Sequence, residues 1–361
     1  MGDDEKLQAV RARIDEIDRQ LQDLITERAR CAREVARLKD VTGDDSEYYR
    51  PEREAQILRT VVSRNQGPLS DDDLARLFRE IMSACLALQR PMKVAYLGPE
   101  GTFTQAAVFK HFGHAVTTVP LGAIDEVFRE VESCAAHYGV VPIENSTEGA
   151  VSHTLDMFMV STLKICSEVE LRIHHNLLSR ATDMGGIRRI YAHQMALAQC
   201  REWLDGKLPN VERIAVVSNA EAARLAAAEP DSAAIAGEAA AEIYGLRVLV
   251  ANIEDRPDNT TRFLVIGRQL PAPSGRDKTS LLVSAANRPG ALFRLLQPLA
   301  QHGISLTRIE SRPSRQGMWE YVFFMDIEGH AEDEKVSRAL AALEREAAMV
   351  KILGAYPCAV L

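Results

Sequence analysis

The spacing of apolar residues predicts only helices in the first quarter of the chain. Between residues 7 and 90, apolar positions recur at steps of three and four. The first helix would run to Lys39 and measure about 50 Å at 1.5 Å per residue. A break is expected at Gly43, and Pro51 and Ser70 are well placed to begin two shorter helices. One long helix and two short ones cannot readily enclose a core, so we expect two copies of the chain to pair.

Beyond Pro91 the pattern changes to short apolar runs that alternate with helical stretches. Strands are predicted at 93–97, 138–143, 189–192, 214–217 and 262–266. This alternation is typical of an α/β domain with a mostly parallel sheet.

A third pattern follows the Pro- and Gly-containing linker at 271–275. Strands are predicted at 279–286, 304–311, 318–327 and 350–356, and helices at 291–302 and 332–347. This βαββαβ order is typical of a ferredoxin-like α+β module. We therefore expect three domains, at residues 1–91, 93–270 and 277–361.

Composition and charge narrow the classes of function. The formal net charge is -8 and the pI about 5.7, so nucleic acid and anionic membrane are poor partners. An anionic substrate would then need a local cluster of Arg and Lys. Six cysteines without a C-x-x-C pair suggest free thiols in a reducing compartment and no zinc site. There is no signal peptide and no apolar run of 18 residues, so we expect a cytoplasmic protein.

Cations interrupt the apolar stripe of the first predicted helix. On a helical wheel Arg28 and Lys39 lie along the stripe and Arg11 lies at its edge. Each could extend its stem over apolar surface towards water, or the set could bind a small polyanion, since buried cations need anionic partners. Arg11 and Arg28 are 17 residues apart, about 26 Å along a helix. They cannot hold one small molecule within a single chain, but antiparallel pairing of two copies would bring Arg11 of one copy towards Arg28 and Lys39 of the other.

The arrangement of polar residues on the three helices resembles the all-helical chorismate mutases. The matching positions are Arg11, Arg28, Lys39, Arg53, Glu54 and Gln89. The resemblance implies a domain-swapped dimer in which Arg11 of the partner chain, Arg28 and Arg53 bind the carboxylates of chorismate. It also implies that Lys39 and Gln89 bond to the ether oxygen and Glu54 to a ring hydroxyl. Cys85 stands at a substrate-binding position where some members carry Ser, and Arg50 where some carry Asp.

Three short motifs mark strand ends in the central region. They are Gly98-Pro99-Glu100-Gly101-Thr102-Phe103, Pro142-Ile143-Glu144-Asn145-Ser146 and Asn259-Thr260-Thr261-Arg262-Phe263. Each alone could be an ordinary turn, but strand ends in α/β sheets are where ligands bind. The chain lacks a P-loop Lys and dinucleotide-binding spacing, so ATP and nicotinamide chemistry are disfavoured.

Together the three motifs resemble the prephenate dehydratase family. The resemblance implies two lobes like those of a periplasmic binding protein, 93–168 with 250–268 and 169–249, with the site between them and no cofactor or metal. Thr261 would donate to the leaving hydroxyl of prephenate, and Glu144 and Asn145 would position the substrate. Substrate contacts are also implied for Thr102, Ser146, Gln199 and Arg262, the last as a carboxylate ligand or a structural cation. His193 is expected to be structural.

Two turns of the last region, 287–292 and 310–313, resemble the ACT domain in its phenylalanine-binding form. The residues implied to bind phenylalanine between two modules are Gly290, Ala291, Leu292, Glu310, Ser311 and Arg312. The sequence thus predicts a cytoplasmic, homodimeric or larger enzyme of phenylalanine biosynthesis, acting on chorismate and prephenate and inhibited by phenylalanine. The alternatives are a phenylalanine-responsive regulator with an inactive dehydratase half, favoured by departures from the family pattern at 192–195, and a solute-binding transport protein.

Overall fold

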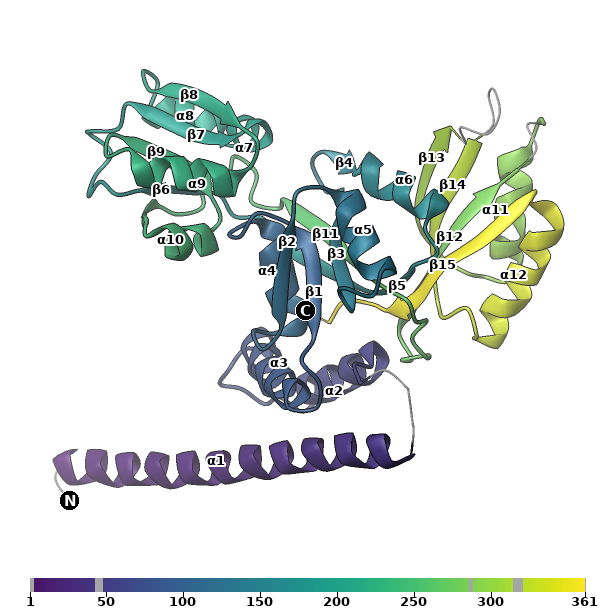
Figure 1. The fold of residues 1–361 in the computed structure, drawn as a ribbon, viewed down its shortest axis with the longest axis horizontal. Coiled ribbons are helices and arrows are strands. Elements are labelled where there is room, and N and C mark those ends of the chain that lie inside the picture. The colour runs from purple at the N-terminus through teal and green to yellow at the C-terminus, as the bar shows by residue number, and fades with distance from the viewer. Residues whose placement is uncertain (1–2, 43–47, 286–287, 314–320, 361) are drawn as a thin grey trace.

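The computed structural model describes residues 3–42, 48–285, 288–313 and 321–360. It shows an N-terminal helical region, a central α/β region of two lobes and a C-terminal module (Figure 1). The predicted break at Gly43, the turn residue Asn287 and residues 318–320 of a predicted strand lie outside the described residues.

The first helix, α1 (Asp3–Thr42), is a single long rod set apart from the rest of the chain (Figure 1). Its contact with the chain includes a bond of 3.4 Å from Arg28 Nη1 to the Ile81 carbonyl. Ten large apolar side chains along it are 40–74% exposed: Leu7, Val10, Ile14, Ile17, Leu21, Leu24, Ile25, Val35, Leu38 and Val41. No other part of the described chain covers this apolar stripe. It is the surface on which the sequence analysis predicts that a second copy packs.

Two shorter helices form a hairpin that contacts the rest of the chain. They are α2 (Pro51–Ser63), with Pro at its first position, and α3 (Asp71–Ala87), capped by Ser70 as predicted. Arg59 Nη2 donates to the Arg276 carbonyl at 2.8 Å, and Arg79 Nη2 donates to the Val360 carbonyl at 3.2 Å. The hairpin thus contacts the start of the C-terminal module and its tail, and Glu80 of α3 accepts from the His114 amide of the central region at 3.1 Å.

The first lobe has a mixed sheet. Its order is β2 (Thr117–Leu121), β1 (Lys93–Leu97), β3 (Tyr138–Asn145), β11 (Thr260–Gly267) and β5 (Lys164–Arg172), with β4 (Gly149–Ala150) beside β3. Its helices are α4 (Phe103–Phe112), α5 (Ile124–Glu132) and α6 (Ser152–Val160). β1 pairs parallel with β2 and β3, but β11 is antiparallel to β3 and β5. The expectation of a mostly parallel sheet is wrong, because β11 enters this sheet from the second lobe.

The second lobe repeats this design. Its sheet order is β10 (Arg247–Val250), β6 (Asn176–Ser179), β9 (Ser232–Ala236), β7 (Arg189–His193) and β8 (Glu212–Val216). Its helices are α7 (Gln194–Gln199), α8 (Arg201–Lys207), α9 (Asn219–Ala228) and α10 (Glu238–Tyr244). The lobe boundary predicted after residue 168 falls too early, because β5 continues in register with β11 as far as Arg172.

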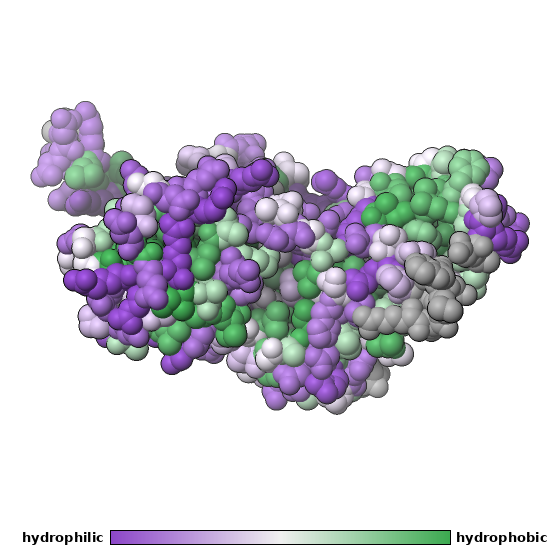
Figure 2. Space-filling model, turned by 90° about the horizontal axis from the view of Figure 1, so that it is seen from above, coloured by the Kyte–Doolittle hydropathy of each residue, from purple (hydrophilic) through white to green (hydrophobic). Residues whose placement is uncertain are grey.

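The C-terminal module has the predicted βαββαβ order. It contains β12 (Asp277–Ser284), α11 (Ala291–Gln301), β13 (Leu306–Pro313), β14 (Tyr321–Glu328), α12 (Glu334–Glu346) and β15 (Met349–Pro357). β15 packs directly on β5 of the first lobe, where a Cβ on Gly354 would overlap the backbone of Ile165. Figure 2 shows apolar surface over this module, whose exposed apolar side chains include Phe293 and Ile309.

Candidate active site

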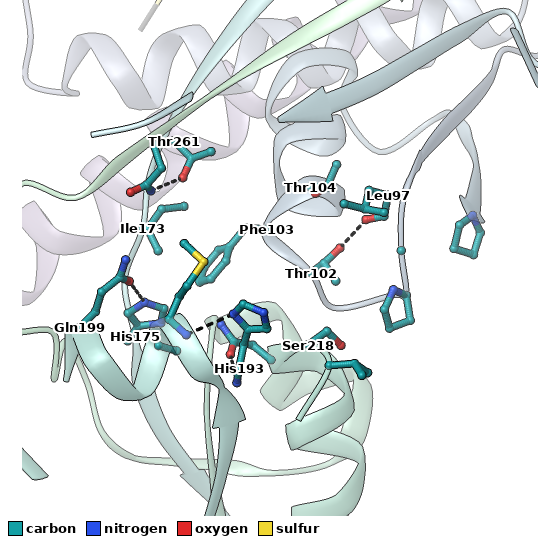
Figure 3. Close-up of a pocket in the computed structure, with 18 of the residues that line it drawn as sticks. Leu97, Thr102, Phe103, Thr104, Ile173, His175, His193, Gln199, Ser218 and Thr261 are labelled. Carbon is teal, nitrogen blue, oxygen red and sulfur yellow. Dashed lines mark hydrogen bonds between the residues drawn. The ribbon is translucent and has the colours of Figure 1, made fainter. Parts of the chain in front are cut away.

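The two lobes enclose a cavity of about 710 Å³. The first lobe lines it with the ends of β1 and β3, the start of β11 and the N-terminus of α4. The second lobe contributes the N-termini of α7 and α9 (Figure 3). Asn145, Thr261, Thr102 and Gln199, four of the predicted site residues, all line this cavity.

A chain of hydrogen bonds crosses the floor of the cavity. Asn145 Nδ2 donates to Thr261 Oγ1 and to Asn259 Oδ1, both at 2.8 Å. Asn259 Nδ2 donates at 3.1 Å to Gln199 Oε1, which also bonds to His175 Nε2 at 2.8 Å. Because the Thr261 oxygen accepts from Asn145, its hydroxyl proton is available to a bound molecule.

Two polar side chains of the cavity wall cap helices. Thr102 accepts from the Gln105 amide at 3.4 Å and caps α4, and His193 Nδ1 accepts from the Met195 amide at 3.3 Å and caps α7. The structural role expected for His193 agrees with this contact.

Glu144 and Arg262 do not face the cavity. Successive side chains of a strand point to opposite faces, so Asn145 and Thr261 face the cavity while their neighbours face the C-terminal module. Glu144 Oε2 lies 2.8 Å from Arg308 Nε of β13, and neither Glu144 nor Arg262 lines the cavity. The direct substrate contacts expected of these two residues are corrected accordingly.

Arg262 is a structural cation in a buried ion-pair network. Its guanidinium donates to Glu168 at 2.8 Å, to Asp326 at 2.6 Å and to the Tyr356 hydroxyl at 2.9 Å. Lys278 Nζ lies 2.9 Å from the same Glu168 carboxylate, so two cations balance two anions. Burial alone would lower the pKa of Arg262, but Tyr356, Asp326 and Glu168 outweigh it and raise that pKa. The network joins β11 and β5 to the module.

Ser146 also lies away from the cavity. Its Oγ accepts from the Thr260 amide at 3.0 Å, and its own amide donates to the Thr260 carbonyl at 2.9 Å. These bonds fix the turn after β3 against the start of β11, so Ser146 supports the site without lining it.

The polar residues of the cavity wall that sequence reasoning missed include His175, Ser218 and Asn219. Ser218 follows a predicted strand and has a residue type that favours helix N-termini, which could have marked it. His175 lies where the chain crosses between the lobes, after β5 and before β6. No local pattern identifies a cavity residue at such a crossing.

The electrostatics of the cavity differ from expectation. Its lining residues include no Arg, Lys, Asp or Glu. The predicted local cluster of Arg and Lys is therefore absent from this cavity, since the nearby cations Arg262 and Arg308 are engaged on the opposite face of the sheet.

The polar residues predicted to form a site on the three N-terminal helices do not all come together within a single chain. Lys39 Nζ lies 4.9 Å from the centre of the Tyr48 ring, Cys85 is buried and Gln89 is partly buried. Arg11 and Arg53 are exposed. Because α1 is one continuous helix, Arg11 is about 26 Å from Arg28.

The side chain of Glu54 points to the junction with the central region, whereas that of its neighbour Arg53 is exposed. Its carboxylate is 4.0 Å from Arg79 Nε, and it shares a small cavity with His111 and Val360. Burial, opposed by Arg79, raises the pKa of Glu54 from its ordinary 4.5 to about 7. The predicted contact with a ring hydroxyl does not fit this position.

The residues expected to bind phenylalanine lie at one end of the module. Gly290 precedes α11 with φ of 74°, and the chain reaches it from the end of β12. The strand register places Ser284, at the end of β12, level with Val322, and Val322 level with Arg312. The two turns therefore lie at the same end of the sheet.

Two absences hold for the part of the chain that the structure describes. No group of three or more His, Cys, Asp or Glu side chains is placed to hold a metal ion. None of the helices there combines the length and the apolar character needed to cross a membrane.

Comparison with known proteins gives a consistent result over the whole chain. Family models match for chorismate mutase type II (residues 10–90), prephenate dehydratase (94–270) and the ACT domain (279–345). Two relatives named bifunctional chorismate mutase/prephenate dehydratase, from Stutzerimonas stutzeri and Pseudomonas aeruginosa, are each 57% identical over the full length of both chains. A crystal structure of prephenate dehydratase from Arthrobacter aurescens in complex with L-Phe is 38% identical, with a TM-score of 0.69, over 74% of this chain and 90% of that one.

Glu54→Gln should flatten part of the pH dependence of stability. The pKa of Glu54 in the folded chain, about 7, is above its ordinary 4.5. Its contribution is therefore fully present below pH 4.5 and is lost as pH rises through 7. Between pH 5 and 8 the parent should lose about 2 kcal/mol of unfolding free energy that the variant keeps. Urea unfolding at both pH values measures this, with the exposed Glu242→Gln as control, and equal losses in parent and Glu54→Gln would contradict it.

Proposed function

The chain belongs to the family of bifunctional chorismate mutase/prephenate dehydratases, and we propose from its geometry which residues serve the two reactions. It rearranges chorismate to prephenate and converts prephenate to phenylpyruvate, in the biosynthesis of phenylalanine. Its ACT domain makes it subject to feedback inhibition by phenylalanine.

Thr261 is the proposed donor in the dehydratase reaction. The bond between the ring of prephenate and its carboxylate breaks, carbon dioxide leaves, and the electron pair enters the ring. The ring hydroxyl is expelled and takes up a proton to leave as water. The observation that carries this assignment is the Asn145 bond to Thr261 Oγ1, which directs the threonine proton away from Asn145 and towards a ligand. Gln199 and Asn259, joined to Asn145, hold the substrate.

The mutase site is proposed to form between two copies of the chain. The exposed apolar stripe of α1 supplies the pairing surface, and antiparallel α1 helices would place Arg11 of one copy beside Arg28 and Lys39 of the other. These cations, with Arg53 and Gln89, would bind chorismate in a compact conformer and stabilise charge on its ether oxygen. Cys85 would line this site, and Glu54 is left out because of its contact with Arg79. The assembly would thus be a homodimer or a larger oligomer.

A cytoplasmic location is also proposed. The six cysteines are thiols that form no disulfide among the described residues, which is typical of proteins in a reducing compartment.

The route of feedback is proposed to run through β13 of the ACT domain. Arg308 and Arg312, on its inner side, pair with Glu144 at 2.8 Å and Asp156 at 2.9 Å in the dehydratase lobe. The same strand carries Glu310 and Ser311, expected to frame phenylalanine with Gly290, Ala291 and Leu292. A shift of β13 would be felt at Glu144, the neighbour of Asn145.

The function as a whole is tested by following chorismate, prephenate and phenylpyruvate over time with the purified chain. Phenylpyruvate should form, and phenylalanine should suppress its formation. Accumulation of prephenate alone would instead favour a phenylalanine-responsive regulator with an inactive dehydratase half. No turnover would contradict both enzymatic assignments.

Thr261→Val should lower the dehydratase kcat about 100-fold, because the variant keeps the side-chain shape but cannot donate a proton. Thr261→Ser keeps the hydroxyl and should be far more active than Thr261→Val. Steady-state rates with prephenate measure the difference, and formation of prephenate from chorismate reports intact folding. Equal rates for the Val and Ser variants would remove Thr261 from this role.

Arg308→Gln should raise the phenylalanine concentration for half-inhibition about tenfold, since a coupling free energy of 1–3 kcal/mol is typical. Calorimetry should show that phenylalanine still binds. The matched control is Arg189→Gln, which breaks an ion pair with Glu229 in the other lobe. Unchanged inhibition in Arg308→Gln would show that feedback takes another route.

A further inference from the structure

The dehydratase cavity must bind an ion with two negative charges although no Arg or Lys lines it. The substrate class follows from the proposed function, on which this inference rests. Transferring carboxylates from water into a cavity costs free energy unless polar groups replace their hydration. The structure must therefore supply positive potential from something other than side-chain cations.

The first source is the N-terminus of α4, a helix of 10 residues in the first lobe. Thr102 Oγ1 accepts from the amide of Gln105, and the Thr102 carbonyl accepts from that of Ala106. The amides of Phe103 and Thr104 have no acceptor among the described residues, as expected in a first helical turn. All three residues from Thr102 to Thr104 line the cavity (Figure 3).

The second source is the N-terminus of α9, also of 10 residues, in the opposite lobe. Ser218 Oγ accepts from the Glu221 amide at 3.0 Å, and Asn219 Oδ1 accepts from the His193 amide at 2.9 Å. The amides of Asn219 and Ala220 are without an acceptor in the described part of the chain. Ser218 and Asn219 line the cavity, so each lobe presents to it the N-terminus of one helix of 10 residues.

An independent observation in the cavity wall points to a polar ligand. The side chain of His175 is 2% exposed and lines the cavity, and its Nδ1 has no hydrogen-bond partner. Its ring lies 5.6 Å from that of Phe103, at the start of α4. Because Gln199 Oε1 is an acceptor, His175 Nε2 carries the proton that bonds to it, and Nδ1 is left as an acceptor. A buried acceptor without a partner is expected to be satisfied by a ligand or by a water held with it.

We infer that the cavity holds the two carboxylates of its substrate at the N-termini of α4 and α9, one in each lobe, in place of cations. Each helix offers free amides and the positive end of its dipole, the combination that binds anions at helix starts. The substrate would thereby bridge the lobes, while Thr261 and Asn145 contact the ring between them.

The test places a negative charge at one helix start without removing its cap. Ser218→Asp and Ser218→Asn both supply a good capping residue, and they differ in charge. With prephenate as substrate, Ser218→Asp should have a KM at least about 30-fold above that of Ser218→Asn, because its carboxylate repels the substrate from the site. Thr102→Asp and Thr102→Asn form the same pair in the other lobe. Prephenate formation from chorismate should be equal within each pair and reports folding.

The outcomes are distinct. A KM that rises in the Asp variants of both lobes supports the inference. Equal KM values for Asp and Asn variants at both positions, in a chain whose parent makes phenylpyruvate, overturn it and leave the proposed function intact. A parent chain that makes no phenylpyruvate from prephenate contradicts the proposed function, and this inference with it.

Discussion

The ion-pair network around Arg262 fixes the relation between the catalytic lobe and the regulatory module. Arg262 comes from β11, Glu168 from β5, and Asp326 and Tyr356 from the module. A buried charge left without its partner is strongly destabilising, on the order of 3–5 kcal/mol. Replacing Arg262 or Asp326 alone would leave such a charge at the closed interface, so the lobe and the module depend on each other there. The pair of Glu144 and Arg308 is open to water on its acidic side, where the carboxylate is 39% exposed, while the Arg308 side chain is 11% exposed.

The alternation of side chains along β3 and β11 places the proposed catalytic residues and the contacts with the module on opposite faces of one sheet. Asn145 and Thr261 face the cavity, whereas Glu144 and Arg262 face the module. Asn145 and Thr261 are thus each next in sequence to a residue that contacts the module. Displacement of a strand by the module would move both neighbours together, because backbone geometry is stiff. The proposed route of feedback is therefore short, from a residue that contacts the module to its neighbour in the cavity.

The two proposed sites differ in the groups that supply positive potential, and this difference follows from their folds. The residues proposed for the mutase site project from helices, and side-chain cations on those helices would supply positive charge for chorismate. The dehydratase cavity lies between sheets whose following helices point their N-termini inwards, so backbone amides are available there. Each fold supplies positive potential through the groups that its geometry presents to the site.

The sequence by itself determined the order of the three domains, the starts of the helices at Pro51 and Ser70, and the strand-end motifs around Asn145 and Thr261. These depend on periodicity and local capping, which are properties of neighbouring residues. It could not separate Thr261 from Arg262 as a substrate contact, because the face of a strand that meets the substrate is decided by packing. His175, Ser218 and the pairing of Glu54 with Arg79 needed the tertiary structure for the same reason. Their positions depend on contacts between residues far apart in the chain, and a local sequence pattern does not determine which distant residues come close in space.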